Sequence, residues 1–174
     1  MFVKMKQISS HLICFFALCI SNIIVLNAQD PESEVKDTIR WFTLEEALEA
    51  QQTNKKKILI DIYTDWCHWC KAMDQKTFTD TTLISLINTH FYPVKFNGES
   101  KEEIEFQGKQ FKYVIVGRRG INSLAYYLMN GRTAFPTIVF LNEDLEKIGA
   151  TAGFKTAEQL AAELKTIIGP AAVD

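Results

Sequence analysis

The chain has 174 residues, and 47% of them are hydrophobic, so it can form one globular domain with a substantial core. Its formal net charge at pH 7 is −2, without the basic excess of phosphate-binding domains, and we therefore exclude nucleic acid as a partner. No internal repeat or low-complexity tract interrupts the sequence.

The N-terminal segment predicts a secretory signal peptide. Lys4 and Lys6 form a positively charged start, residues 12–26 form an apolar stretch, and residues 27–29 have the composition of a cleavage region. The alternative is an uncleaved membrane anchor, but the apolar stretch is shorter than the ~20 residues that span a bilayer. We therefore expect residues 1–28 to be removed and no membrane span to remain.

The signal implies an exported protein, in the periplasm or cell envelope of a bacterium. Residues 171–174 are not an endoplasmic-reticulum retention signal, which favours a bacterial envelope over an organelle lumen. Residues 29–40 are mostly polar and are expected to form a flexible lead-in. The globular domain is expected over residues 41–170.

Removal of the signal leaves two cysteines in the mature chain. Cys14 and Cys19 lie within the signal, so Cys67 and Cys70 are the sulfurs that remain. No separate structural disulfide is then possible, and export implies an oxidising or redox-managed compartment. This pair must therefore carry any thiol chemistry alone.

Capping residues and hydrophobic patterns predict alternating helices and strands along the mature chain. Thr43 and Glu46 form a capping box, and the strand that follows is apolar on both faces apart from Asp61, as in a central strand. Residues 142–144 form a turn between two strands that we expect to pair as a hairpin. The expected helices span about 43–54, 67–78, 80–90 and 156–169, and the expected strands span 57–63, 91–96, 136–141 and 147–152.

The motif Cys67-His68-Trp69-Cys70 follows the first strand and opens the next expected helix. Two cysteines three positions apart at the first turn of a helix can close a small disulfide. The sulfur nearer the helix N-terminus faces unpaired backbone N–H groups and the positive end of the helix dipole, which favour the thiolate. Because the thiolate is the species that attacks disulfides, the motif predicts redox chemistry.

Other uses of such a motif fit the sequence poorly. A c-type haem requires histidine after the second cysteine, where this chain has Lys71. A structural zinc site needs four ligands, and besides the cysteines the mature chain offers only a poorly placed His68 and a distant His90. A purely structural disulfide would close too short a loop to stabilise the fold much. We expect no metal and no cofactor other than the Cys67–Cys70 disulfide.

The order of these elements and their motifs resembles the thioredoxin superfamily. The chain is most similar to exported thioredoxin-like proteins and to the periplasmic thioredoxin-like domain of transmembrane thiol:disulfide interchange reductases. The resemblance implies an α/β thioredoxin fold, in which helices flank a central mixed β-sheet. The matching segments are Ile58-Leu59-Ile60-Asp61, Trp66-Cys67-His68-Trp69-Cys70-Lys71, Val94-Lys95-Phe96-Asn97, Phe135-Pro136-Thr137-Ile138-Val139-Phe140 and the closing Gly153 with its helix.

The resemblance also implies roles for residues around the motif. Cys67 is expected to be the exposed, attacking cysteine, and Cys70 the buried cysteine that resolves the mixed disulfide. Asp61 lies where thioredoxins place a buried carboxylate, whose raised pKa suits it to move a proton to or from Cys70. The alternative is an aspartate at a strand end that reaches solvent. Lys95 matches a lysine that neighbours this carboxylate in the family, or is simply a surface lysine.

Substrate binding is expected around Pro136. In the family this proline is cis and faces the disulfide, and the backbone of Phe135 would pair with an extended segment of substrate. The cis assignment rests on the resemblance alone, because most X-Pro bonds are trans. Trp66 and Trp69 are expected to form an apolar rim for docking partner proteins, with plain packing as the alternative.

His68 is a candidate for tuning the redox pair. A protonated His68 near the sulfur would favour the reduced form and make the pair more oxidising. The alternative is an exposed histidine with little effect. The sequence leaves both open, because the oxidising histidine of the family occupies the position that Trp69 holds here.

An insertion at about residues 98–133 distinguishes the chain from a minimal thioredoxin. Residues 102–116 alternate apolar and polar around Gln107-Gly108-Lys109, which predicts a hairpin, and residues 121–129 predict a helix. The insertion precedes the Pro136 loop and could shape a substrate groove. We favour the alternative, a scaffold elaboration with solvated arginines. The arginines that would give such a groove positive charge are Arg118, Arg119 and Arg132.

We therefore predict a thiol-disulfide oxidoreductase of the cell envelope that exchanges dithiol for disulfide with protein substrates, acting as a reductase. A reductase outside the cytoplasm needs an electron donor, so a membrane thiol:disulfide reductase is the implied partner. The alternative is a non-catalytic binding or chaperone-like module. In that case Trp66, Trp69 and Phe135 would dock a partner and the disulfide would be incidental.

Overall fold

The computed structural model describes residues 38–169, so the expected signal peptide and most of the expected lead-in lie outside the described residues. None of the helices in the described range is long and apolar enough to cross a membrane. The helices are α1 (Leu44–Thr53), α2 (His68–Lys76), α3 (Thr81–His90), α4 (Ser123–Leu128) and α5 (Ala157–Ile168). The strands are β1 (Lys57–Tyr63), β2 (Phe91–Asn97), β3 (Ile104–Phe106), β4 (Lys109–Phe111), β5 (Tyr113–Val116), β6 (Arg119–Asn122), β7 (Thr137–Leu141) and β8 (Lys147–Ala152).

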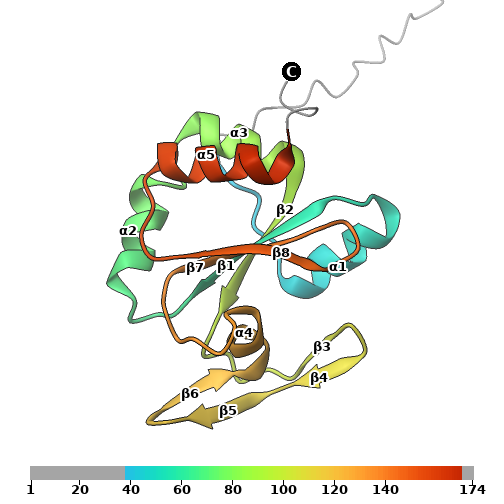
Figure 1. Ribbon diagram of the computed structural model, residues 1–174, viewed down its shortest axis with the longest axis vertical. Helices are drawn as coiled ribbons and strands as arrows, with labels where there is room; N and C mark the ends of the chain where they lie inside the picture. Colours follow the sequence, from blue (N-terminus) through green and yellow to red (C-terminus); the bar gives the residue numbers. More distant parts are fainter. Residues whose placement is uncertain (1–37, 170–174) are drawn as a thin grey trace, which may run out of the picture. The chain divides into compact units, whose positions relative to one another are not determined.

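Four strands form a central mixed sheet in the order β2-β1-β7-β8. Strand β1 runs parallel to β2 and antiparallel to β7, and β7 runs antiparallel to β8. The sheet is flanked by helices on both sides, with α3 and α5 on one side and α1 and α4 on the other (Figure 1). This is the α/β arrangement that the resemblance to thioredoxins implied.

Strand β1 lies between two hydrophobic clusters, because successive side chains of a strand point to opposite faces of the sheet. Ile58, Ile60 and Ile62 pack with buried residues of α1, α4 and β3. Leu59 packs on the other face with buried residues of α2, α3 and α5. Asp61 has the same parity as Leu59, so its carboxylate lies on the face that α2 covers.

The helix N-termini that the sequence predicts are confirmed. Thr43 and Glu46 form a reciprocal capping box at α1, as do Thr156 and Gln159 at α5. The Asp80 carboxylate accepts a hydrogen bond from the Leu83 N–H at 2.8 Å and caps α3. Each cap satisfies a backbone donor that the first turn of a helix leaves unpaired.

The domain begins earlier than the sequence predicts. Ile39, in the expected flexible lead-in, is buried. Asn88 of α3 holds the backbone on both sides of it, accepting a hydrogen bond from the Arg40 N–H and donating one to the Thr38 carbonyl, both at 3.1 Å. An apolar side chain in the core and two tertiary hydrogen bonds therefore order this segment from residue 38.

The insertion contains two hairpins, where the sequence predicts one that extends to Val116. Strands β3 and β4 pair around a turn at Gln107 and Gly108, and β5 and β6 pair around a turn at Gly117, all three with positive φ. The second hairpin was missed because its first strand continues the alternating pattern of the first hairpin, with no glycine or proline to mark the boundary. The helix α4 is confirmed but shorter than predicted, because Ile121 lies in β6 and Asn122 caps the helix.

Buried Asn122 attaches the insertion to the end of the sheet. Its backbone N–H donates to the Gly98 carbonyl at 2.8 Å, and its side-chain amide donates to the carbonyls of Ser100 (3.3 Å) and Glu102 (3.0 Å). The Gly98 N–H in turn donates to the carbonyl of Tyr63, the last residue of β1, at 2.7 Å. The second hairpin therefore lies beside the segment that leads from β1 into α2.

Candidate redox site

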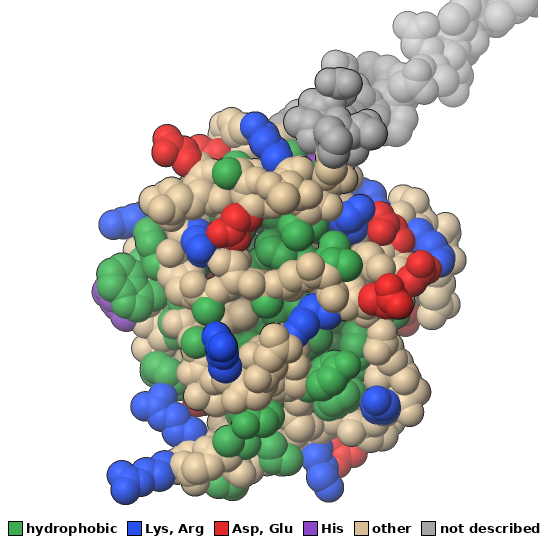
Figure 2. All heavy atoms as spheres, in the orientation of Figure 1, with side chains coloured by type: hydrophobic (Ala, Val, Ile, Leu, Met, Phe, Trp, Pro, Cys, Tyr) green, Lys and Arg blue, Asp and Glu red, His purple; other side chains and the backbone are tan. Residues whose placement is uncertain are grey.

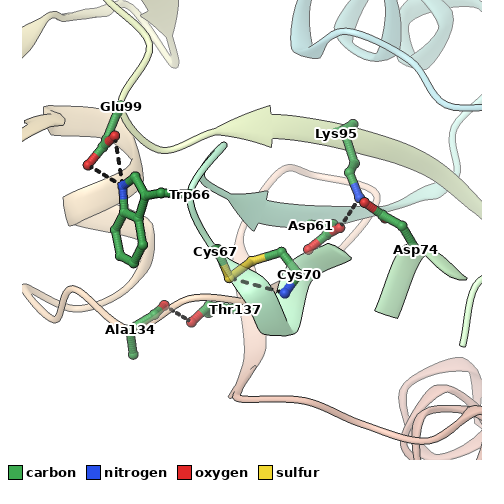
Figure 3. Close-up of a disulfide and its surroundings, with 9 residues drawn as sticks. All are labelled: Asp61, Trp66, Cys67, Cys70, Asp74, Lys95, Glu99, Ala134 and Thr137. Carbon is green, nitrogen blue, oxygen red and sulfur yellow. Dashed lines mark hydrogen bonds and ion pairs between the residues drawn. A yellow bond between two sulfur atoms is a disulfide. The ribbon is translucent and has the colours of Figure 1, made fainter. Parts of the chain in front are cut away.

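A disulfide joins Cys67 and Cys70 at the start of α2 (Figure 3). Cys67 is the N-cap residue, and its Sγ accepts a hydrogen bond from the Cys70 N–H at 3.1 Å. A turn between β1 and α2, closed by the Cys67 N–H and the Thr64 carbonyl at 3.0 Å, carries the chain from the sheet to the motif. The end of a central strand and the start of a helix thus hold the sulfurs together.

One expectation about the pair is wrong for this disulfide form. We expected Cys67 to be exposed, but it is only 3% exposed, close to the 2% of Cys70. The reason is that the Cys67 sulfur turns into the first helical turn, where it is bonded to Cys70 and accepts the amide hydrogen bond.

Asp61 is 1% exposed, so the alternative that it reaches solvent is wrong. Its Oδ2 accepts a hydrogen bond from the Lys95 Nζ at 2.7 Å, while its Oδ1 has no hydrogen-bond partner among the described residues. Burial is the largest influence on the pKa of Asp61 and, together with the negative charge of Asp74, raises this pKa above its ordinary value despite the opposing effect of Lys95. The site therefore contains a buried carboxyl group with a raised proton affinity and one free oxygen.

Lys95 lies directly opposite Asp61 in the pairing of β1 with β2 and is not a free surface lysine. It forms salt bridges with Asp61 and Asp74 and lies within about 5 Å of the ring centroids of Trp41, Tyr63 and Phe78. Burial lowers the pKa of Lys95, but the two carboxylates together outweigh burial and raise it.

Asp74 was missed by the sequence analysis. It follows Cys70 by four positions on α2, a spacing that places both residues on one helix face. Figure 3 shows Asp74 reaching from α2 toward the Lys95 that pairs with Asp61. This spacing was the signal that could have identified it.

Trp66, directly before Cys67, is 53% exposed but fixed on three sides. Its Nε1–H donates to the two carboxylate oxygens of Glu99, at 3.0 and 3.1 Å. Its ring meets Phe135 edge-to-face with centroids 5.9 Å apart, and the Arg119 guanidinium lies 4.5 Å from the ring centroid. Glu99 was not found as a site residue from the sequence, because no local motif includes it, whereas Arg119 was named there as an arginine of a possible substrate groove.

The Phe135–Pro136 peptide bond is cis, as the resemblance implied. The Thr137 hydroxyl donates to the Ala134 carbonyl at 2.7 Å, and the Gly153 N–H donates to the Pro136 carbonyl at 2.8 Å, so both sides of the proline are tied down. Figure 3 shows this loop beside the disulfide. A Cβ on Gly98 would lie 2.7 Å from the Phe135 ring, so the glycine permits the close packing of this loop.

Trp69 and His68 form the outer side of the site. Trp69 is 57% exposed and contacts Phe154, with ring centroids 5.6 Å apart. The exposed His68 ring packs edge-to-face on Trp69, also at 5.6 Å. The neighbour of the His68 ring is thus an aromatic ring. Arg132, the third arginine of the expected groove, lines a different cavity beside Ala150 and Ala152.

No metal-binding cluster accompanies the disulfide: within residues 38–169, no group of three or more His, Cys, Asp or Glu side chains is arranged to hold a metal ion.

Comparison with known proteins gives one family match and several relatives. Residues 32–169 match the family model Thioredox_DsbH, described as "Protein of unknown function, DUF255". Over 141 residues the chain is 28% identical to the thiol:disulfide interchange protein DsbD of Pseudoalteromonas atlantica. This match covers 79% of this chain and 20% of that protein. It is also 24% identical to the uncharacterized protein B0495.5 of Caenorhabditis elegans over 111 residues, covering 63% and 13%. The chain thus spans a fifth or less of the length of these relatives.

Solved structures share the fold. A thioredoxin from Thermus thermophilus superposes with a TM-score of 0.56 at 17% identity, covering 75% of this chain and 87% of that one. A putative disulphide-isomerase from Bacteroides thetaiotaomicron superposes with a TM-score of 0.51 at 24% identity, covering 73% and 88%. At these identities the likeness concerns the fold alone. The fold, the Cys67–Cys70 pair and the family match together identify the chain as a thioredoxin-superfamily protein that belongs to the Thioredox_DsbH family.

Proposed function

We propose that the chain is an exported reductase that transfers electrons from Cys67 and Cys70 to disulfides of protein substrates. The proposal rests on one arrangement: the disulfide at the start of α2 lies with a buried carboxylate, Asp61, on the face of the sheet that α2 covers. One oxygen of this carboxylate is paired with Lys95 and the other has no partner among the described residues. The similarity to a segment of DsbD supports a setting in the cell envelope. Residues 1–28 would direct export, and a membrane thiol:disulfide reductase would supply the electrons.

The chemistry proceeds in two balanced steps. The Cys67 thiolate attacks one sulfur of the substrate disulfide, a mixed disulfide forms, and the other substrate sulfur leaves as a thiolate that takes up a proton. Cys70 then loses its proton and attacks Cys67, which releases the second substrate thiolate and closes the Cys67–Cys70 disulfide. Two electrons pass to the substrate. Asp61, with its raised pKa and free oxygen, accepts the proton of Cys70.

Substrate binding would use the surface beside the disulfide. The backbone of Phe135, next to Pro136, would pair with an extended substrate segment, and exposed Trp66 and Trp69 would contact its side chains. The same exposed tryptophans favour the second candidate function, a non-catalytic binding module. Such a module would keep its affinity for partners when both cysteines are replaced by serine.

The reduction potential of the pair tests the proposal. The protein is equilibrated with glutathione and dithiothreitol buffers, and the thiols are counted by alkylation and mass spectrometry. We expect a value near the roughly −270 mV of thioredoxin, whereas one near about −120 mV would mark a disulfide donor and overturn the reductase assignment. A pair that does not cycle would favour the binding module. As a matched pair of variants, Cys70→Ser should accumulate mixed disulfides with substrate and Cys67→Ser should not.

A further inference from the structure

A cavity of about 350 Å³ lies between the β5–β6 hairpin and the loop that precedes Pro136. The hairpin contributes Arg118 and Arg119 to its wall, and the loop contributes Thr133 and Phe135. Phe135 also contacts Trp66, the residue before Cys67. The cavity therefore shares a wall with the redox site.

The charges in this wall favour an acidic ligand. Arg118 and Arg119 are exposed, and neither forms a salt bridge, since all the salt bridges within residues 38–169 use lysines. The acidic residue of the wall, Glu99, has both carboxylate oxygens engaged by the Trp66 indole. Figure 2 shows Lys and Arg side chains projecting from the surface over the tip of this hairpin. Two guanidinium groups are thus available to a ligand beside the disulfide.

The hairpin is held in place. Gly120 of β6 lies against the ring of Tyr113 of β5, and a Cβ on this glycine would lie 1.7 Å from the Tyr113 hydroxyl oxygen. Asn122, at the end of β6, is fixed by the backbone contacts described above. The strand that carries Arg119 is anchored at both places, and the Arg119 guanidinium lies over the Trp66 ring. The guanidinium is therefore positioned before a ligand arrives, which reduces the entropic cost of binding.

We propose that this cavity is a specificity subsite that binds the carboxylate of an Asp or Glu side chain of the substrate, close in sequence to the reacting cysteine. The inference rests on the proposed function, because it assumes a polypeptide that lies along the Phe135 backbone. A guanidinium recognises a carboxylate through two parallel N–H donors, and Arg119, stacked on Trp66, presents such a pair near the disulfide. The subsite gives the insertion a role in substrate choice.

Peptide substrates that differ in one charge test the subsite. Three peptides carry the same intramolecular disulfide and differ at one position, two residues before one of the cysteines, where they have Glu, Gln or Lys. A second set of three has the same substitutions two residues after that cysteine. The reduced full chain is mixed with each peptide, and its oxidation is followed by stopped-flow tryptophan fluorescence. At low salt we expect the second-order rate constant for the Glu peptide to exceed that for the Gln peptide about threefold to tenfold on one side. The Lys peptide should be slowest, and high salt should reduce these differences.

Arginine variants then separate the subsite from general charge effects. In Arg118→Gln/Arg119→Gln the ratio of the Glu rate to the Gln rate should fall to about one, since both guanidinium groups are removed. Arg132→Gln removes one guanidinium charge at a different cavity and should keep the wild-type ratio. A wild-type ratio of one on both sides, or a preference that persists in the double variant, overturns the inference. If the reduced chain reacts with none of the peptides, the result contradicts the proposed function itself.

Discussion

At the scale of single residues, Asp61 is the most unusual group of the site. It is an ionisable side chain that is almost fully buried, with one oxygen paired to Lys95 and the other unpaired among the described residues. Burial, the largest influence, raises the pKa of Asp61 despite the lysine, so the folded protein binds a proton at this site more tightly than the unfolded chain does. Protonation of Asp61 is therefore coupled to folding as well as to catalysis.

This coupling predicts a pH dependence of stability. The pKa of Asp61 is higher in the folded protein than in the unfolded chain. Asp61 therefore stabilises the folded state fully below the unfolded-chain pKa of about 4, and this stabilisation is lost as pH rises through the folded-state pKa. Over that window the free energy of unfolding should fall by up to about 1.4 kcal/mol per pH unit relative to Asp61→Asn. Urea unfolding of the oxidised protein and the variant from pH 4 to 9 measures the difference.

A second variant serves as the control for this experiment. Asp74→Asn removes one carboxylate partner of Lys95 but keeps the buried Asp61. The free energy of unfolding of this variant, relative to that of Asp61→Asn, should therefore still fall as pH rises. A difference between wild type and Asp61→Asn that stays constant across the pH range would contradict the raised pKa.

At the scale of elements, the β5–β6 hairpin is the part of the chain that departs furthest from expectation. The sequence indicates that residues 98–133 are an insertion and that they contain a hairpin and a helix. It does not indicate that β6 ends at a buried asparagine, because the Asn122 contacts join segments about twenty positions apart. Local sequence patterns identify individual helices and hairpins. The hydrogen bonds of Asn122, in contrast, depend on the tertiary structure.

Asn122 should be essential for holding the insertion. Asn122→Ala leaves the carbonyls of Ser100 and Glu102 without their donor and removes the N-cap of α4, which should lower the free energy of unfolding by about 2–4 kcal/mol. Urea unfolding measures this loss. Asn54→Ala, at an exposed position, changes the same side chain and should shift stability by less than about 0.5 kcal/mol. Equal losses in the two variants would contradict the structural role of Asn122.

At the scale of the whole molecule, the fold could be predicted because its signals are local and agree with one another. The capping residues Thr43, Asp80 and Thr156 mark helix starts, and the run of apolar residues in β1 indicates a central strand. The centre of the site could be predicted for the same reason, since Cys67 and Cys70 form a local motif. Glu99 was missed because folding brings it to the site from a segment that lacks a motif, whereas Asp74 lies on the same helix as Cys70 and only its spacing could have identified it.

The proposed direction of electron transfer can be argued from the stability of the whole molecule. Folding and reduction form a thermodynamic cycle, so a pair that is more reducing in the folded protein than in the unfolded chain requires the oxidised form to be the more stable one. Each 30 mV of difference in potential corresponds to about 1.4 kcal/mol of difference in the free energy of unfolding. A disulfide donor has the opposite order, because its reduced form is stabilised.

For this protein the burial of both sulfurs and of the Asp61 carboxylate favours the oxidised state. A thiolate that forms on reduction would be a charge in a site where Cys67 and Cys70 are at most 3% exposed in the oxidised form and the nearby carboxylate has a raised pKa. We therefore expect the oxidised protein to unfold at higher urea concentration than the reduced protein at pH 7. Cys67→Ser/Cys70→Ser, which cannot form the disulfide, should be insensitive to the redox buffer. A reduced form more stable than the oxidised form would instead indicate a protein that donates disulfides to its substrates.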